Sequence, residues 1–252
     1  MLGRVRSTIA TGVRFGLARF NLTIRDISTI PSWDAFFNQI RSHHIGIRSV
    51  FDIGVDQGTP ELYDAFPNAE LFLFDPTPAA AAYMKKLATK RRVHAFNVAL
   101  SDRHKENVEL YSPVTKADGS GDTTLLKKQI QRGAPLTTST ILTERFDDLI
   151  GKIETPALCK IDVQGAELMV LQGMTKRLPD IDYFIIETST LSPFKEAPEF
   201  DQICRFMMDH GFALYDIMSL QRRPLDGALG AMDVAFVRKT CPLRADPRWG
   251  GA

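Results

Sequence analysis

From about residue 45 onward, short hydrophobic runs alternate with segments whose apolar residues recur at helical spacing. Runs of about four to eight apolar residues are typical of buried strands, and strands that alternate with helices are typical of a mostly parallel sheet. The expected strands are 48–53, 70–74, 93–98, 157–163, 183–187, 212–217 and 232–237, with a shorter one at 107–111. The pattern predicts an α/β, Rossmann-like fold with a mostly parallel seven-stranded sheet and helices on both faces.

Capping residues mark where the helices of this pattern begin and end. Thr59 and Thr77 each precede a proline, which suits an N-cap followed by the first helical position. The expected helices begin at residue 59 and span 77–90, 144–150, 167–172 and 198–210. Gly173 and Gly211 are expected just past the ends of the last two. Residues 112–140, rich in Ser, Thr, Gly and Lys, are expected to form an irregular loop.

Length and composition indicate one globular domain. The chain has 252 residues, of which 44% are hydrophobic and 24% charged, and its formal net charge is +1. We expect an N-terminal helical arm over residues 1–45, a single domain over 46–240 and a C-terminal tail over 241–252. Three widely spaced cysteines argue for a reducing compartment, such as the cytoplasm, and against a disulfide framework or a zinc site.

The first 25 residues are basic and amphipathic. They contain five arginines and no acidic residue, and their apolar residues recur at helical spacing. We expect a helix packed on the domain. Two alternatives are a segment that contacts an anionic membrane surface peripherally and a cleaved targeting peptide. No apolar run reaches the roughly 20 residues that cross a bilayer.

The segment 50–58, VFDIGVDQG, has the pattern of a strand followed by a ligand-binding turn. Its Asp-x-Gly sequence, with Gly54 and then Gly58, allows close approach of the backbone to a ligand. The spacing differs from the Gly-x-Gly-x-x-Gly of dinucleotide folds, and Asp52 would repel a pyrophosphate. S-adenosylmethionine (AdoMet) carries an ammonium and a sulfonium and has no phosphate, so carboxylates suit it.

A second acid supports a nucleoside ligand. Asp75 follows the next strand, 23 residues after Asp52, where a carboxylate of a Rossmann-like fold accepts hydrogen bonds from the ribose hydroxyls. Each acid has a structural alternative: Asp52 could hold the glycine turn, and Asp75 could precede a helix. Together they favour AdoMet, with NAD as an alternative.

Several blocks together resemble the FkbM-type methyltransferases. The blocks are 50–58, FDPTP at 74–78, NVALSD at 97–102, RFDDL at 145–149, KIDVQGAE at 160–167, IIE at 185–187 and DVAFV at 233–237. KIDVQGAE is the most specific of them, and the resemblance covers residues 46–238 in the family's order. It implies a class I fold, AdoMet as methyl donor, and O-methylation of a hydroxyl on a sugar, glycan or natural product.

The resemblance also implies a set of cofactor-binding residues. They are Asp52, Gly54, Val55, Asp56, Gly58, Asp75, Pro76, Asn97 and Ala99. Three of them depart from the family pattern: Asp75 stands where Glu is more common, and Val55 and Asp56 stand where Ala-Asn is usual. The changes at Val55 and Asp56 favour the alternative of a non-catalytic AdoMet-binding or interaction protein on the same fold.

Acids at the ends of two later strands are the candidates for catalysis. Ligands of open α/β sheets bind beyond the carboxyl ends of the strands, and Asp162 and Glu187 end strands there. We expect Asp162 to orient the acceptor or act as general base, with helix capping as its structural alternative. Lys160 is a third candidate or a buried partner for an acid. Glu167 is expected to be structural.

Other chemistries find less support in the sequence. Asp162 and Glu187 could hold a divalent metal, but nothing in their spacing requires one, and no metal is expected. The Asn/Asp-Pro-Pro-Tyr/Phe motif of nucleic-acid amine methylation is missing after the fourth strand, where DVQG stands. The sequence has no concentrated basic stripe either, so nucleic acid is not the expected acceptor. The expected acceptor is a small molecule or a glycan.

Overall fold

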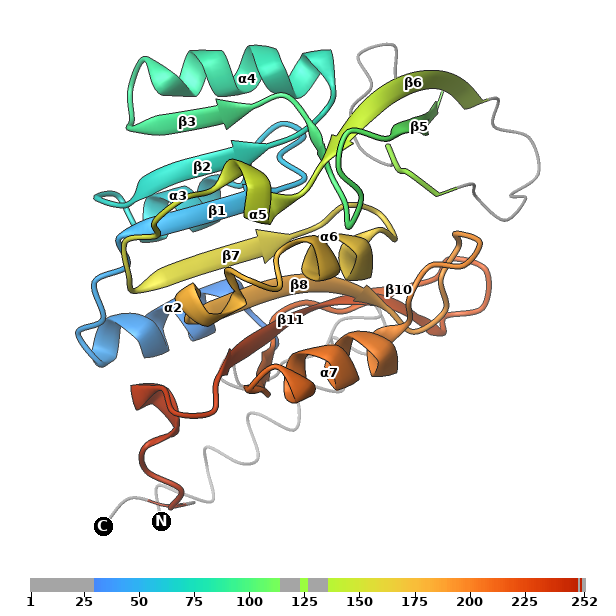
Figure 1. Ribbon diagram of the computed structural model, residues 1–252. Helices are drawn as coiled ribbons and strands as arrows, with labels where there is room; N and C mark the ends of the chain where they lie inside the picture. Colours follow the sequence, from blue (N-terminus) through green and yellow to red (C-terminus); the bar gives the residue numbers. More distant parts are fainter. Residues whose placement is uncertain (1–29, 114–122, 127–135, 249, 251–252) are drawn as a thin grey trace, which may run out of the picture.

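The computed structural model describes residues 30–113, 123–126, 136–248 and 250. Its main sheet has the strand order β10-β11-β8-β7-β1-β2-β3, and β9 also pairs with β11 (Figure 1). The strands are β1 (Ser49–Ile53), β2 (Glu70–Phe74), β3 (Val93–Phe96), β7 (Ala157–Ile161), β8 (Tyr183–Ser189), β9 (Phe212–Ile217), β10 (Gln221–Arg222) and β11 (Leu229–Arg238).

The sheet is mostly parallel, as the sequence predicts. Strands β3, β2, β1, β7 and β8 run parallel, while β11 is antiparallel to β8, β9 and β10. The sheet has eight strands rather than the seven expected. The additional strand, β10, consists of two exposed residues. A strand this short shows no hydrophobic pattern in the sequence.

Helices cover both faces of the sheet, and each face has its own buried cluster. Helices α2 (Trp33–Ser42), α3 (Pro60–Ala65) and α4 (Pro78–Ala88) contribute to one cluster. Helices α5 (Phe146–Leu149), α6 (Glu167–Gly173) and α7 (Phe200–Asp209) contribute to the other. Short 3-10 turns, η2 (Leu178–Asp180) and η3 (Pro242–Arg244), complete the described elements. Successive strand residues alternate between the clusters, so both faces of the sheet are buried.

A second, three-stranded sheet was predicted only in part, through the short strand expected at 107–111. It consists of β4 (Ala99–Leu100), β5 (Asn107–Pro113) and β6 (Leu136–Glu144). The irregular loop expected over 112–140 includes residues 136–140, but these residues belong to β6, which pairs antiparallel with β5. Its sequence LTTSTILTE has β-branched residues on both faces and little apolar alternation, so the strand is defined by its partner. Most of the predicted loop, 114–122 and 127–135, lies outside the described residues.

The packed domain extends beyond the expected limits at both ends. Helix α2 lies within the segment expected to be an arm, yet Phe36, Phe37 and Ile40 are fully buried. In the expected tail, Cys241 and Leu243 belong to the same buried cluster. The basic segment 1–25 lies outside the described residues, so its packing and its contact with a membrane stay predictions.

Most of the helix-end predictions are confirmed. The Thr77 hydroxyl caps α4 by accepting the Ala80 N–H at 3.2 Å. Thr59 has the N-cap position of α3, but its hydroxyl caps nothing and donates to Asp52 instead. Gly211 follows α7 with φ +87°. Gly173 was expected past the end of α6, but it is the last helical residue.

Gly173 lies so close to the backbone of Ser101 that a larger side chain would clash with it. We therefore expect Gly173→Ala to lower the free energy of unfolding by about 1–3 kcal/mol. A Cβ at this position would lie 2.1 Å from the backbone oxygen of Ser101. The steric cost exceeds the roughly 1 kcal/mol that alanine gains in a helix. Urea unfolding measures the change. Gly151→Ala is the control, because a Cβ there meets nothing within 4 Å; equal effects of the two variants would contradict the assignment.

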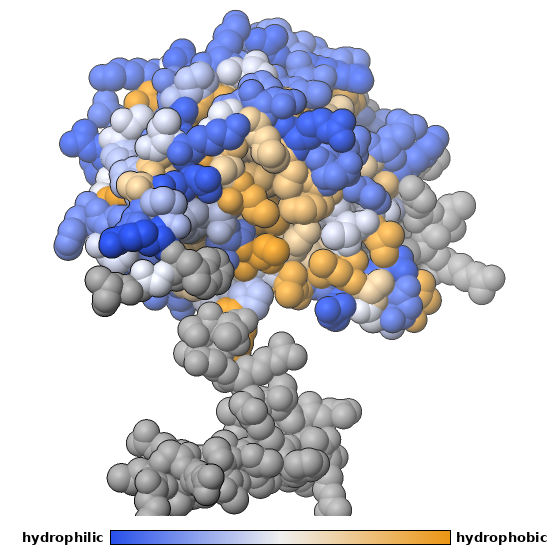
Figure 2. All heavy atoms as spheres, turned by 90° about the horizontal axis from the view of Figure 1, so that it is seen from below, coloured by the Kyte–Doolittle hydropathy of each residue, from blue (hydrophilic) through white to orange (hydrophobic). Residues whose placement is uncertain are grey.

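The surface and the cysteines add two observations. Among the described residues, no helix is long and apolar enough to cross a membrane. Hydrophobic residues gather in the middle of the face seen from below, bordered by hydrophilic ones (Figure 2). The three cysteines are free thiols, as expected.

Candidate active site

The candidate site lies where the strand order of the main sheet reverses. From β1 the chain proceeds outward through β2 to β3, and it then returns to place β7 on the other side of β1. At such a reversal, a crevice opens beyond the carboxyl ends of the strands. Gly54, Asp75 and Asp162 directly follow β1, β2 and β7, so the topology brings these three residues to one place.

The turn after β1 depends on left-handed backbone at three residues. Gly54, Asp56 and Gly58 have φ values of +85°, +47° and +92°. A Cβ on Gly54 would lie 1.7 Å from the backbone oxygen of Asp162, and one on Gly58 would lie 2.2 Å from the ring of Tyr83. The glycines thus allow close approach of the turn to its neighbours, as expected from the sequence. At Gly58, however, the close neighbour is the Tyr83 side chain and not a ligand.

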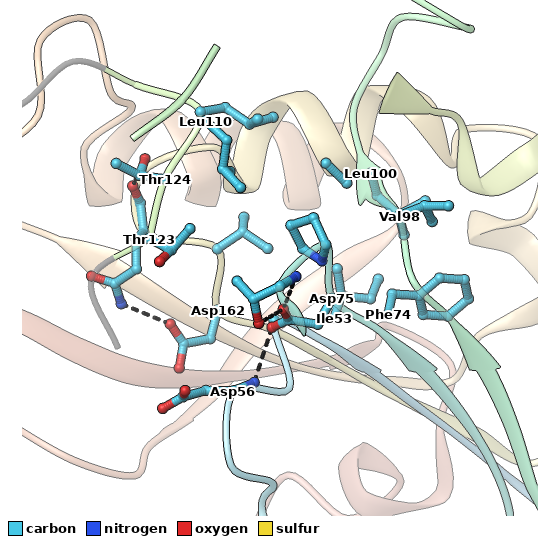
Figure 3. Close-up of a pocket in the computed structure, with 17 residues that line it drawn as sticks. Ile53, Asp56, Phe74, Asp75, Val98, Leu100, Leu110, Thr123, Thr124 and Asp162 are labelled. Atoms are coloured by element: carbon cyan, nitrogen blue, oxygen red, sulfur yellow. Dashed lines mark hydrogen bonds between the residues drawn. The ribbon is translucent and has the colours of Figure 1, made fainter. Parts of the chain in front are cut away.

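A cavity of about 130 Å³ opens between these strand ends. Asp56, Asp75 and Asp162 lie along one side, and Thr123 and Thr124 lie across the cavity from them (Figure 3). The remaining wall is mostly apolar and includes Ile53, Phe74, Pro76, Val98, Ala99, Leu100, Leu110 and Leu125. The cavity therefore combines carboxylates with an apolar surface on which a flat ring can lie.

Asp75 is the best-organised acid of this cavity. It is 6% exposed, and its Oδ2 accepts the Asp56 N–H at 3.0 Å. Its Oδ1 accepts the N–H and the hydroxyl of Thr77 at 2.8 and 2.6 Å. Asn97 donates to the backbone oxygen of Asp75 at 2.8 Å. The acid thus organises the loop and still faces the cavity, where carboxylate oxygens with several acceptor sites can bind further donors.

Asp52 does not reach the cavity, contrary to the expectation of direct cofactor contact. Its side chain is fully buried. Its Oδ2 accepts the hydroxyls of Thr59 and Tyr63 at 2.9 and 2.5 Å, and its Oδ1 lies 3.2 Å from Lys160 Nζ. Burial and the neighbouring Asp52 raise the pKa of Tyr63, so the phenol stays protonated as a donor. Asp52 therefore holds the glycine turn from behind.

Lys160 connects the two acids that flank the turn. Parallel pairing of β1 with β7 places Lys160 opposite Asp52, and Nζ also lies 2.9 Å from the Gly54 oxygen and 3.5 Å from Asp162 Oδ2. Burial alone would lower the pKa of Lys160, but Asp52 and Asp162 outweigh it and raise that pKa. A lysine held protonated cannot act as a general base. Its role is to supply positive charge behind the site.

Asp162 follows β7, and Gln164 links it to Glu187. Glu187 was expected to end its strand but lies two residues before the end of β8. The Gln164 amide donates to Asp162 Oδ1 at 3.0 Å and to Glu187 Oε2 at 2.9 Å. Burial raises the pKa of Asp162, but Lys160 and the hydrogen bonds from Glu187 and Gln164 bring it below its usual value. Burial and the charge of Asp162 raise the pKa of Glu187. These opposite shifts favour a charged Asp162 beside a protonated Glu187.

Glu167 has the structural role expected for it. Its Oε1 accepts the N–H groups of Val163 and Gly165 at 3.1 and 3.0 Å, which fixes the loop between β7 and α6. Burial raises the pKa of Glu167 to about 7. Asp162 caps no helix, since the N-cap of α6 is Ala166 without a side-chain cap.

A second cavity of about 750 Å³ adjoins the first. Gln164 lines both cavities, and Glu187 lines the second. Its other walls come from β8, the loop after it and the β10–β11 hairpin, and they include Ser189, Leu191, Pro193, Phe194, Arg222 and Leu225. The predictions missed Gln164 as a site residue, although the KIDVQGAE block contains it.

The structure places some of the expected site residues in the wall of the first cavity and others outside it. Those that line the first cavity are Gly54, Asp56, Asp75, Pro76, Ala99 and Asp162. Val55 is buried in the apolar cluster against the helices, and Gly58 and Asn97 support the loops from outside the cavity. Among the described residues, no group of three or more His, Cys, Asp or Glu could hold a metal ion.

Solved structures with a similar fold include methyltransferases of low sequence identity. Magnesium protoporphyrin IX methyltransferase from Synechocystis PCC 6803 is 10% identical, with a TM-score of 0.46 over 81% of this chain and 77% of that one. The 1,6-didemethyltoxoflavin N1-methyltransferase of Burkholderia thailandensis is 11% identical, with a TM-score of 0.41 over 94% and 89%. No curated protein matches the sequence significantly.

The family comparison agrees with the resemblance seen in the sequence. The model of the methyltransferase FkbM domain matches residues 52–214, a span that contains the turn after β1, Asp75, Asp162 and Glu187. Methyltransferases of this kind use AdoMet as the methyl donor, so the cofactor expected from the sequence is confirmed and the NAD alternative is dropped. The chain belongs to the FkbM methyltransferase family.

Proposed function

We propose that this methyltransferase transfers the methyl group of AdoMet to a hydroxyl of a small molecule, with a sugar, glycan or natural product as the acceptor class. The observation that carries the proposal is the pair Asp162 and Glu187 at the boundary of the two cavities. A hydroxyl has to lose a proton as it is methylated, and a charged carboxylate placed at this boundary can accept it.

The first cavity offers acceptors, negative charge and apolar surface that suit AdoMet. Asp75 faces it with a carboxylate for the ribose hydroxyls, Asp56 and Asp162 add negative charge near a cationic sulfonium, and Phe74, Val98 and Leu100 give an apolar wall. Its free volume of about 130 Å³ is below the roughly 300–1,000 Å³ of ligand pockets. Residues 123–125 form one wall of this cavity.

The second cavity is the proposed acceptor site. At about 750 Å³ it has the size of a typical small-molecule pocket. Phe194, Leu191 and Leu225 supply apolar surface, and Glu187, Ser189 and Arg222 supply polar groups. When bound, AdoMet supplies an electrophilic methyl group. The protein's part is to hold the acceptor hydroxyl in line with it, while Asp162 takes the hydroxyl proton and Lys160 keeps Asp162 charged.

Replacement of Asp75 with alanine is expected to weaken AdoMet binding about 30-fold. Hydrogen bonds to a charged group contribute about 1.5–3 kcal/mol, and about 2 kcal/mol corresponds to this change in Kd. Isothermal titration calorimetry measures it. Asp64→Ala, in an exposed position on α3, is the matched control and should bind like the wild type. Unchanged affinity in Asp75→Ala would place the ribose elsewhere.

The function itself is tested with an acceptor screen. Purified protein is incubated with AdoMet labelled in its methyl group and with panels of hydroxylated sugars, glycans and natural products, and the label is followed into product. Transfer to a hydroxyl oxygen, located by mass spectrometry and NMR, supports the proposal. Transfer to a nitrogen or carbon atom would contradict the proposed O-methylation. Tight AdoMet binding without transfer to any panel member would favour a non-catalytic AdoMet-binding protein.

A further inference from the structure

Gln164 has an unusual position at the candidate site. It follows β7 in the loop before α6, and it lines both cavities. Its φ of +55° lies in the left-handed region, which residues other than glycine, asparagine and aspartate enter rarely. Such conformations persist only where the surrounding structure enforces them, and they cluster at functional sites.

The side-chain amide of Gln164 is fully committed to two acids. Its Nε2 carries two N–H donors, and these meet Asp162 Oδ1 at 3.0 Å and Glu187 Oε2 at 2.9 Å. The two acids come from neighbouring parallel strands, β7 and β8. A neutral amide can thus join two carboxyl groups without adding charge between them.

The backbone of Gln164 is held in place from the opposite side. The Thr124 hydroxyl donates to the Gln164 carbonyl oxygen at 2.6 Å. Thr124 is itself fixed by two backbone hydrogen bonds with Tyr111, at 2.9 and 3.0 Å, and it is 2% exposed. The wall of the first cavity and the amide between the acids are therefore connected through one residue.

We propose that Gln164 is a positioning residue whose amide holds Asp162 and Glu187 as one carboxyl pair, oriented toward the boundary where the acceptor hydroxyl meets the methyl donor. The catalytic part of this inference, the orientation of the pair toward the acceptor hydroxyl, rests on the proposed function. The pair itself is a property of the protein alone, so it can be measured without an acceptor.

The charges around the pair determine how it titrates. The groups that face it are Lys160 on β7, Glu167 at the start of α6, Asp233 opposite Glu187 on β11 and, behind Lys160, Asp52 on β1. Lys160, the hydrogen bond from Glu187 and the Gln164 amide favour the charged form of Asp162, whereas burial and the neighbouring acids favour the protonated form of Glu187. Loss of the amide should therefore raise the pKa of Asp162.

The test is a carboxyl carbon-13 NMR titration of wild type and Gln164→Met, a variant of similar size without donors. Asp162→Asn and Glu187→Gln assign the two resonances. In the wild type, Asp162 should titrate below the ordinary aspartate range while Glu187 holds its proton through neutral pH. In Gln164→Met, we expect the Asp162 step to move up by about one pH unit, a tenfold change in proton affinity.

Two further variants make the result specific. Gln164→Asn adopts left-handed backbone readily, but it is one methylene shorter and cannot span both acids, so the same shift is expected in a well-folded protein. Gln172→Met, exposed on α6, should titrate like the wild type. An unmoved Asp162 step in both Gln164 variants overturns the inference.

Kinetics separate this inference from the proposed function. With an acceptor in hand, the Gln164 variants should lose about 10- to 100-fold in kcat, with KM for AdoMet nearly unchanged, and the acid limb of the pH profile should move up with the NMR step. A change in KM alone would mean that Gln164 shapes the cavity and does not position the acids. If the wild type methylates no hydroxyl but the NMR shift is seen, the proposed reaction fails and the carboxyl pair stands.

Discussion

The variant Lys160→Met is expected to lose about 3–5 kcal/mol of unfolding free energy, because it leaves a buried acid without its cation. Lys160 is 6% exposed and Asp52 is fully buried, so water cannot replace the missing charge. The two hydroxyl donors, Thr59 and Tyr63, remain on Asp52, but hydroxyls carry no compensating charge. Urea unfolding at neutral pH measures the difference.

Two comparisons identify the cause of this loss. Lys152→Met removes an exposed lysine whose pair with Glu154 is on the surface, and it should change stability by less than about 1 kcal/mol. Adding Asp52→Asn to Lys160→Met should recover part of the loss, because no unpaired charge is then left buried. If the double variant is less stable than Lys160→Met, packing rather than charge explains the effect.

The sign of the pH dependence follows from Lys160. Its folded-state pKa is raised above that of the unfolded chain. The stabilisation is therefore fully present below the ordinary lysine pKa of about 10.4, and it is lost as pH rises through the folded-state value. Wild type and Lys160→Met should accordingly differ by a constant amount around neutral pH and converge only at strongly alkaline pH.

The largest effect on catalysis is expected for Asp162→Asn. If Asp162 accepts the acceptor proton, its amide analogue should lower kcat by about 10²–10⁴-fold, while the shape of the site is kept. AdoMet affinity should fall far less, by about tenfold or 1.4 kcal/mol, because one of the two carboxylates near the sulfonium loses its charge. Single-turnover transfer to the acceptor found in the screen measures the rate without interference from product release.

The control and the pH profile sharpen this prediction. Asp209→Asn, exposed at the end of α7, should react like the wild type. Because the pKa of Asp162 is lowered, wild-type kcat should hold above the ordinary aspartate pKa of about 3.9 and fall only as pH drops through the lower folded-state value. A rate retained in Asp162→Asn would mean that the acceptor loses its proton elsewhere, with Glu187 the next residue to replace.

Strongly patterned elements were predictable because their signals are local. The strands 70–74 and 212–217 match the structure to the residue, since each contains a short run of consecutive apolar residues, 71–74 and 212–215. Helix α4 begins at the expected Thr77-Pro78 signal. Elements whose stability comes from distant partners were missed or misjudged. Strand β6 needs β5, and α2 is fixed by burial of Phe36 and Phe37 against the sheet.

Gly173 and Thr59 show the same limit at single positions. Both have the expected place next to a helix end, but each serves a different neighbour: Gly173 makes room for the backbone of Ser101, and Thr59 donates to Asp52. A local signal tells where a residue stands in an element. It does not tell which distant atom that residue meets.

For the site, the sequence by itself determined the fold class, the resemblance to a methyltransferase family and the strand ends that Gly54, Asp75 and Asp162 follow. It also placed Glu187 on the right strand, although β8 continues to Ser189. These follow from periodicity and short motifs, which depend on neighbours along the chain. Only the tertiary structure decided which acid lines a cavity and which one stabilises the fold from behind it. The register of β1 against β7 pairs Asp52 with Lys160 and removes both from the cavity, and the loop after β7 places Gln164 between Asp162 and Glu187. Burial and distance set the charge of each group, and both are fixed only when segments far apart in the sequence come together.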